Sequence, residues 1–324
     1  MQIKIQDQNI FKKVMKKYST ILILLMMMLI MTILNPKFLT TNNLMNILRQ
    51  QTPIAIMAFG VNLAIISGGI DISVGSVIAM AAVILAKFAK VDSSGAGYPL
   101  IVPIIASLLA GGAAGLINGV VIAYGKVPPF IATLGMMSVA RGVALIISKG
   151  RPITGFSDAF NFIGGGTFLG LPFPIYILLA SYLIIYAILH LTKFGTYIFA
   201  IGSSQMAAEV SGVNVKKTKV VIYVISGVFT GIAAIVLASR TLSGQPAVGE
   251  GYEMNAITAA IIGGTSFSGG IGTAFGTFIG ALIMGVLTNG MTMLQIEPAM
   301  QMVVRGSVIV LAVFADQYRN NYKS

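Results

Sequence analysis

Side chains that could do chemistry are scarce in this chain of 324 residues, and they interrupt long apolar stretches. Cysteine is absent and His190 is the single histidine, so the sequence supplies no thiolate metal site, no His-cluster metal site and no His-paired catalytic relay. A GxxxxGK(S/T) phosphate-binding loop is absent as well. We therefore expect a protein without a catalytic centre, a metal site or a cofactor.

Two glycine-rich breaks between apolar stretches hold the most concentrated polar groups. Residues 67–76 carry Asp71 and Ser73, and residues 263–270 carry one threonine and two serines. At membrane depth, non-helical backbone is tolerated only where it is buried in protein or lines a wet cavity. Such a break indicates either the polar wall of a translocation path or a tight turn in which Asp71 or a serine caps the next helix.

Two arginines, Arg141 and Arg305, fall inside apolar stretches, where a charge is costly and normally faces the protein interior or a cavity. The alternative is an arginine that is structurally paired or that extends its head to the membrane surface. Uncharged amides in other apolar stretches could hydrogen-bond a polyol. The predicted translocation path consists of Gln50, Asn62, Asp71, Ser73, Asn118, Arg141, Asn289 and Arg305.

The composition identifies the environment of these groups. Hydrophobic residues make up 56% of the chain and charged residues 9%, whereas a soluble protein carries about 25% charged residues. The net charge of +12 is then better explained by membrane orientation than by a nucleic-acid partner, and none is expected. We predict an all-α polytopic membrane protein, with residues 1–324 forming one transmembrane domain surrounded by lipid.

The apolar stretches predict about ten spans, each near the roughly 20 residues that cross a bilayer. The first follows a basic tail at 1–17 and lacks a small-residue cleavage site, so we expect it to be retained. The ten predicted spans are 18–34, 46–67, 74–90, 100–123, 130–148, 174–191, 219–239, 254–265, 271–290 and 299–315.

Lysine and arginine counts in the loops predict the orientation. Twelve lie on the side that holds both ends of a ten-span chain, and six lie on the other side. Because basic residues are enriched in cytoplasmic loops, both termini and the long loop 192–218 are expected in the cytoplasm. The protein is accordingly expected in the cytoplasmic (inner) membrane.

Short sequence patterns predict how the spans pack. Small residues recur at four-residue spacing, as in Gly111, Gly115 and Gly119, and again in Gly227 and Gly231, which lets helices approach closely in lipid. An Asn-Gly pair followed by an arginine recurs five spans later. This echo indicates a possible five-plus-five inverted repeat, a common transporter design.

Several stretches together resemble one family, the permease subunits of ribose-type ABC importers for pentoses, hexoses and autoinducers. The similarity extends from about residue 20 to 316. The stretches that carry it are 35–40, 43–48, 69–76, 118–134, 194–215 and 245–266.

This resemblance implies a homodimer or a pair with a sister permease, two cytoplasmic ATP-binding subunits, and an external sugar-binding protein. A monosaccharide would cross by alternating access driven by the ATPases. The implied ATPase-coupling residues are Gln205, Ala207, Ala208, Glu209, Ser211 and Gly212. The external loop residues Arg240, Glu250 and Glu253 would contact the binding protein or simply be solvated.

The coupling segment departs from the family pattern, because an acidic residue usually precedes the two alanines and Ser204-Gln205-Met206 stands there. Contacts to the ATPase are therefore expected to differ in detail. Two other functions stay open: an ABC permease for a nucleoside, an autoinducer or a branched-chain amino acid, and an ion-coupled transporter with Asp71 as the ion-binding carboxylate.

Overall fold

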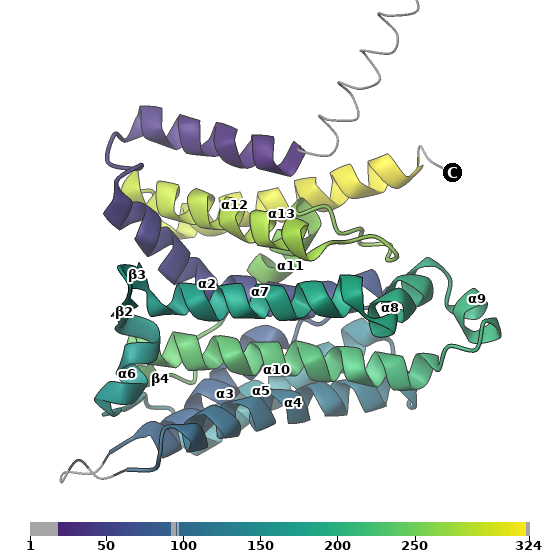
Figure 1. The fold of residues 1–324 in the computed structure, drawn as a ribbon, viewed down its shortest axis with the longest axis horizontal. Helices are drawn as coiled ribbons and strands as arrows, with labels where there is room; N and C mark the ends of the chain where they lie inside the picture. The colour runs from purple at the N-terminus through teal and green to yellow at the C-terminus, as the bar shows by residue number, and fades with distance from the viewer. Residues whose placement is uncertain (1–18, 92–94, 96, 322–324) are drawn as a thin grey trace, which may run out of the picture.

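The computed structural model describes residues 19–91, 95 and 97–321, so the predicted basic tail lies outside the described residues. The described chain folds into a bundle of roughly parallel helices (Figure 1). A helix occupies most of each stretch predicted as a span, although α11 ends three residues before the predicted end and α12 begins three residues after the predicted start. The long elements are the first helix (Ser19–Leu34), α2 (Thr41–Ile66), α3 (Val74–Ala89), α4 (Ile101–Ala123), α5 (Pro129–Ser148), α7 (Phe173–Leu191), α10 (Val215–Thr241), α11 (Tyr252–Ile262), α12 (Ala274–Met293) and α13 (Pro298–Asn321).

Six of these helices are long and apolar enough to cross a membrane, namely α4, α5, α7, α10, α12 and α13. The prediction of an all-α polytopic membrane protein is therefore confirmed. The count of ten spans stays a prediction, because the first helix, α3 and α11 are shorter, and the first half of α2 is polar.

Short elements lie at the two ends of the bundle (Figure 1). One end, here called the α9 end, carries α8 (Lys193–Ser203) and α9 (Gln205–Val210). The opposite end, the α6 end, carries α6 (Asp158–Gly165) and two small antiparallel sheets. In these sheets β1 (Ile153–Thr154) pairs with β4 (Ser243–Gly244), and β2 (Thr167–Phe168) pairs with β3 (Leu171–Pro172). The first helix begins and α13 ends toward the α9 end.

The core lies where α10 packs against α2, α3 and α4. Glycines allow the closest of these approaches: a Cβ at Gly111 of α4 would lie 2.1 Å from the carbonyl oxygen of Gly227 of α10. The reverse holds for a Cβ at Gly227, at 2.1 Å from the Gly111 oxygen. The close packing predicted from the glycine spacing is therefore confirmed for α4 and α10.

Substituting Gly111→Ala should force α4 away from α10 and destabilise the protein by about 1–3 kcal/mol, the usual cost of overpacking. Gly135→Ala on α5 is the matched control, because a Cβ there meets no atom within 4 Å. Thermal denaturation in detergent should give a lower midpoint for the first variant only. Equal midpoints would contradict the packing argument.

Candidate functional site

The loop predicted to couple to an ATPase contains α8 and α9 at the α9 end (Figure 1). Ser204 separates the two helices, and its side chain accepts a hydrogen bond from the Ala207 N–H, which caps α9. Gly212 follows α9 with φ +84°, a conformation that glycine adopts without strain, and the chain then returns to α10. The segment is therefore a short, capped helix held between two tight turns.

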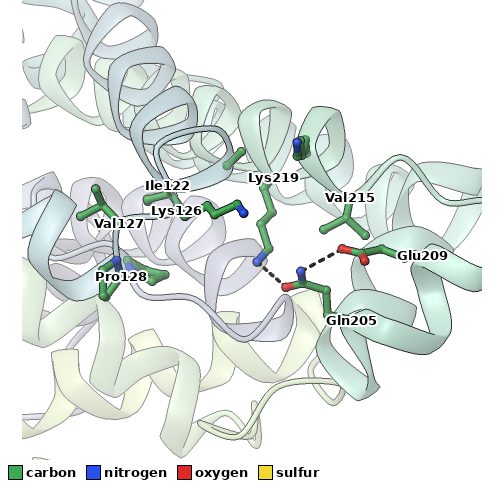
Figure 2. Close-up of a pocket in the computed structure, with 11 residues that line it drawn as sticks. Ile122, Lys126, Val127, Pro128, Gln205, Glu209, Val215 and Lys219 are labelled. Atoms are coloured by element: carbon green, nitrogen blue, oxygen red, sulfur yellow. Dashed lines mark hydrogen bonds between the residues drawn. The ribbon is translucent and has the colours of Figure 1, made fainter.

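Side chains fix α9 to the first turns of α10. Ala208 is buried against Ile201 and Val215. The Gln205 amide donates to the Glu209 carboxylate at 2.9 Å and accepts from the Lys219 ammonium at 2.8 Å (Figure 2). Gln205, expected to face an ATPase, thus already bridges α9 to α10 while Glu209 of the same helix holds its amide, so a displacement of α9 would pull on α10.

Two apolar side chains of α9 are instead exposed. Met206 is 78% exposed and Val210 is 86% exposed. They lie four residues apart on α9, so they share one face of the helix. Neither was among the coupling residues selected from the sequence, although an apolar pair four residues apart on a short helix is a usable signal. Two apolar side chains so exposed on a helix outside the apolar bundle mark a surface that a partner would cover.

A cleft of about 530 Å³ opens beside α9, between the start of α10 and the turn from α4 to α5 (Figure 2). Its charged lining includes Lys126, Lys216 and Lys219, against the single carboxylate of Glu209. The cleft is therefore basic, and it extends the α9 surface toward the centre of the bundle.

Three of the predicted path residues meet in one buried network. The Asp71 carboxylate, 1% exposed, accepts from the Ser73 N–H at 3.0 Å and the Ser73 hydroxyl at 2.6 Å. It also accepts from the Ser226 hydroxyl of α10 at 2.8 Å, and Ser73 accepts from the Asn118 amide of α4 at 3.0 Å. In this conformation the first break is a turn that is hydrogen-bonded to α4 and α10, and Ser226 was not among the residues selected from the sequence.

Asn62 organises the second glycine-rich break. Its amide oxygen accepts from the Thr265 hydroxyl at 2.7 Å, and its nitrogen donates to the Thr273 carbonyl at 3.4 Å. The Gly270 N–H donates to the carbonyl of Ile66, the last residue of α2, at 2.8 Å. The two breaks therefore lie against each other at the end of α2.

Helix α8 also contacts the end of α2, where the two breaks meet. A Cβ at Gly202 would lie 1.8 Å from the Ile66 carbonyl oxygen and 2.5 Å from the Gly270 nitrogen. Gly202, Ile66 and Gly270 form what is here called the glycine junction. This junction joins the α8–α9 segment to both breaks through backbone contact, without an intervening side chain.

Arg141 holds a third irregular segment inside the bundle. Its guanidinium donates to the carbonyls of Pro246 and of Val248, the latter at 2.9 Å, and to the Gly75 carbonyl at 3.4 Å. The segment 245–251 runs from β4 at the α6 end to Gly75 at the start of α3, since a Cβ at Gly75 would lie 2.6 Å from the Gly249 oxygen. Arg141 is thus a clamp on backbone carbonyls.

The three residues predicted to contact an external binding protein differ in how exposed they are. Glu250 is exposed, whereas Glu253 is 9% exposed and accepts from the Gly251 N–H beside Gly75. Arg240 is half-buried and donates to the Arg49 carbonyl at 3.5 Å. Glu253 is buried because the loop that was expected on the outer surface enters the bundle instead.

The remaining path candidates are dispersed. Gln50 is exposed and bonds to Asn46, while Asn289 exchanges two 3.0 Å amide hydrogen bonds with Asn43. Arg305 lines a cavity between α11 and α13. The eight candidates therefore do not share one cavity within the described part of the chain, and their common role in a path stays a prediction.

The Arg141 clamp gives a direct test. Arg141→Lys should destabilise the protein, because one ammonium cannot reproduce the fork that reaches separate carbonyls, and each buried carbonyl left unpaired costs about 1–3 kcal/mol. Arg151→Lys, at an exposed position after α5, is the control. Thermal denaturation in detergent should separate the two variants, and identical midpoints would refute the clamp.

Comparison with known proteins adds independent information. Residues 43–313 match the family described as "Branched-chain amino acid transport system / permease component". The ribose import permease protein RbsC of Escherichia coli (strain K12) is 41% identical over 306 residues, 93% of this chain and 94% of that protein. RbsC of Bacillus subtilis (strain 168) is 40% identical over 312 residues, 96% and 95% of the two chains.

The D-allose transport system permease protein AlsC of Escherichia coli (strain K12) is 38% identical over 305 residues, 93% of this chain and 91% of that protein. No solved structure matches the chain. The resemblance seen in the sequence is confirmed over nearly its whole length: this chain belongs to the family of transport-system permeases that includes the ribose and D-allose permeases.

Proposed function

We propose that this chain is the membrane-spanning subunit of an ABC importer that passes a monosaccharide, ribose or a similar pentose or hexose, by alternating access. The ribose and D-allose permeases among its relatives support a sugar as the solute, and the exposed apolar face of α9 supports a separate ATPase subunit. That face is the observation on which the proposal rests. The chain itself performs no catalysis in this scheme.

The face of α9 suits an ATP-binding subunit. A short amphipathic helix that lays apolar side chains into a groove is a recurrent mode of protein recognition. Met206 and Val210 would be the anchors, and the lysines of the neighbouring cleft would attract an acidic rim. Glu209 and Gln205 would keep the helix aligned with α10 while the partner moves it.

Movement of α9 has a short route into the bundle. Close-packed interiors transmit displacement, because few voids are available to absorb it. A shift of α8 would move Gly202 against Ile66 and Gly270, and so would change how the two glycine-rich breaks meet. Rocking of helices about such a junction is one of the standard forms of conformational switching.

The distribution of charge supports an orientation in the membrane. Exposed lysines at the α9 end, namely Lys126, Lys193, Lys216 and Lys217, favour placing that end in the cytoplasm of an inner-membrane protein. Both ends of the chain would then be cytoplasmic. The α6 end would receive a sugar-binding protein, and a second copy or a sister permease would complete the assembly.

A second candidate has a specific observation in its favour, because the matched family is described by branched-chain amino acid transport. An ABC permease for such an amino acid, a nucleoside or an autoinducer would use the same coupling surface. An ion-coupled transporter is less consistent with Asp71, whose oxygens already accept from hydroxyls and a backbone N–H.

The coupling surface is tested by the double substitution Met206→Ser, Val210→Ser in proteoliposomes that hold this chain, its ATPase and the binding protein. Loss of two apolar anchors should weaken ATPase docking by roughly tenfold or more, since an interface hot spot is worth about 2 kcal/mol. Sugar-stimulated ATP hydrolysis should fall accordingly. Thr196→Ser, exposed on α8 in the same loop and outside the predicted coupling residues, should behave like the unsubstituted protein.

Uptake of labelled D-ribose and L-leucine into the same vesicles separates the candidates. ATP-dependent ribose uptake that leucine does not inhibit supports the sugar importer. Leucine uptake would favour the amino acid alternative. Uptake by this chain without an ATPase, driven by a proton or sodium gradient, would overturn the proposal and would direct attention to Asp71.

A further inference from the structure

Helix α11 begins inside the bundle instead of at its surface. It has 11 residues, so at 1.5 Å per residue it is about 16 Å long, roughly half of the ~30 Å hydrocarbon thickness. Its C-terminal end meets the start of α12, where a Cβ at Gly263 would lie 2.3 Å from the Gly276 oxygen. Its N-terminal end lies beside Gly75, delivered there by the segment that Arg141 clamps (Figure 1).

A cavity of about 480 Å³ lies between the first turn of α11 and the middle of α13. This volume falls within the roughly 300–1,000 Å³ typical of small-molecule sites. The polar groups that line it are Glu250, Asn255 and Arg305, and the apolar ones are Met254, Met302 and Ile309. Arg305 is the eighth residue of α13, so the cavity lies about 10 Å along that helix from the α6 end.

Asn255 is the informative member of this lining. It is 6% exposed, and its side-chain amide makes no hydrogen bond to any residue that the structure describes. Its amide atoms are not sealed inside the protein, so a molecule in the cavity can reach them. A buried amide that lines a cavity therefore points to a ligand that donates and accepts hydrogen bonds there.

Arg305 adds donors on the opposite wall. Its Nε donates to the Gln301 carbonyl of its own helix at 3.2 Å, which fixes the side chain along α13. Its terminal nitrogens make no hydrogen bond among the described residues and stay available. Glu250, exposed on the same cavity, supplies an acceptor. One acid and one base leave the lining without net charge, which suits a neutral solute.

We infer that this cavity holds the sugar during its passage, with Asn255 and Arg305 hydrogen-bonding its hydroxyls and Met254 and Met302 covering its C–H face. The inference rests on the proposed function and adds a location and a chemical class, a neutral polyol of monosaccharide size. Segments that start within the membrane, beside irregular backbone, are where transporters commonly build such sites. Asn255 was not among the residues selected from the sequence.

Cysteine protection tests the location directly, because the chain has no native cysteine. Met302→Cys places a thiol on the cavity wall, and Met254→Cys places one on the facing wall. In vesicles with ATPase and binding protein, millimolar D-ribose should slow maleimide labelling of either thiol several-fold. Leu311→Cys, exposed on the opposite face of α13, is the control, and its labelling should not change.

The polar contact is tested by Asn255→Leu. It should lower the ribose uptake rate about tenfold, the effect of losing one hydrogen bond of about 1.4 kcal/mol, and should abolish ribose protection of the Met302→Cys thiol. Thr258→Val, one turn along α11 and fully buried, is the matched control that perturbs the same helix without touching the cavity. It should retain both properties.

The possible results distinguish this inference from the proposal beneath it. Vesicles that import ribose without protection of either thiol would overturn the cavity assignment and leave the importer intact. Protection by L-leucine instead of ribose would overturn the polyol class. Vesicles of the unsubstituted complex that import no pentose or hexose would overturn the proposed function, and this inference with it.

Discussion

The constraint on which this structure depends is that polar groups away from water must find partners inside the protein. Helices pair most backbone N–H and C=O groups with each other, so the unpaired groups, and the free-energy cost of burying them, are concentrated where helices end. The structure meets it with side chains aimed at those places. Asp71 collects donors at one break, Asn62 serves another, and Arg141 covers the carbonyls of a third. What sequence reasoning took for possible path chemistry is, in this conformation, largely the means of stabilising irregular backbone.

These irregular segments are also arranged relative to one another. The break that contains Asp71 enters from the α9 end and bonds to Ser226, the twelfth residue of α10. The segment 245–251 enters from the α6 end, and the two approach each other where Gly249 packs on Gly75. An inverted repeat would produce this pattern, with matching interruptions reaching the interior from opposite sides. Such a repeat would also account for the half-length of helix α11.

Hydropathy predicted every long helix, because burial in lipid requires long apolar stretches and leaves few other folds possible. Glycine spacing predicted close helix packing along α4 and along α10, but it did not predict that these two helices pack on each other. The partners of Arg141 could not be predicted, since every residue offers a carbonyl and two of the three that it binds are more than 100 residues away. Glu253 was expected outside because a polar loop normally stays at the surface. Asn255 was not selected, because its significance lies in a partner that is missing, which a sequence does not display.

The long reach of Arg141 has a consequence for how the protein is made. The carbonyls that satisfy it lie 105 and 107 residues further along the chain. Asp71 likewise depends on a hydrogen bond from Ser226, which lies 155 residues further along the chain. Chains are synthesised from the N-terminus, so the first half enters the membrane before these partners exist. Native packing of the first half therefore cannot be completed until the ribosome has translated past Val248, and the two halves mature as one folding unit.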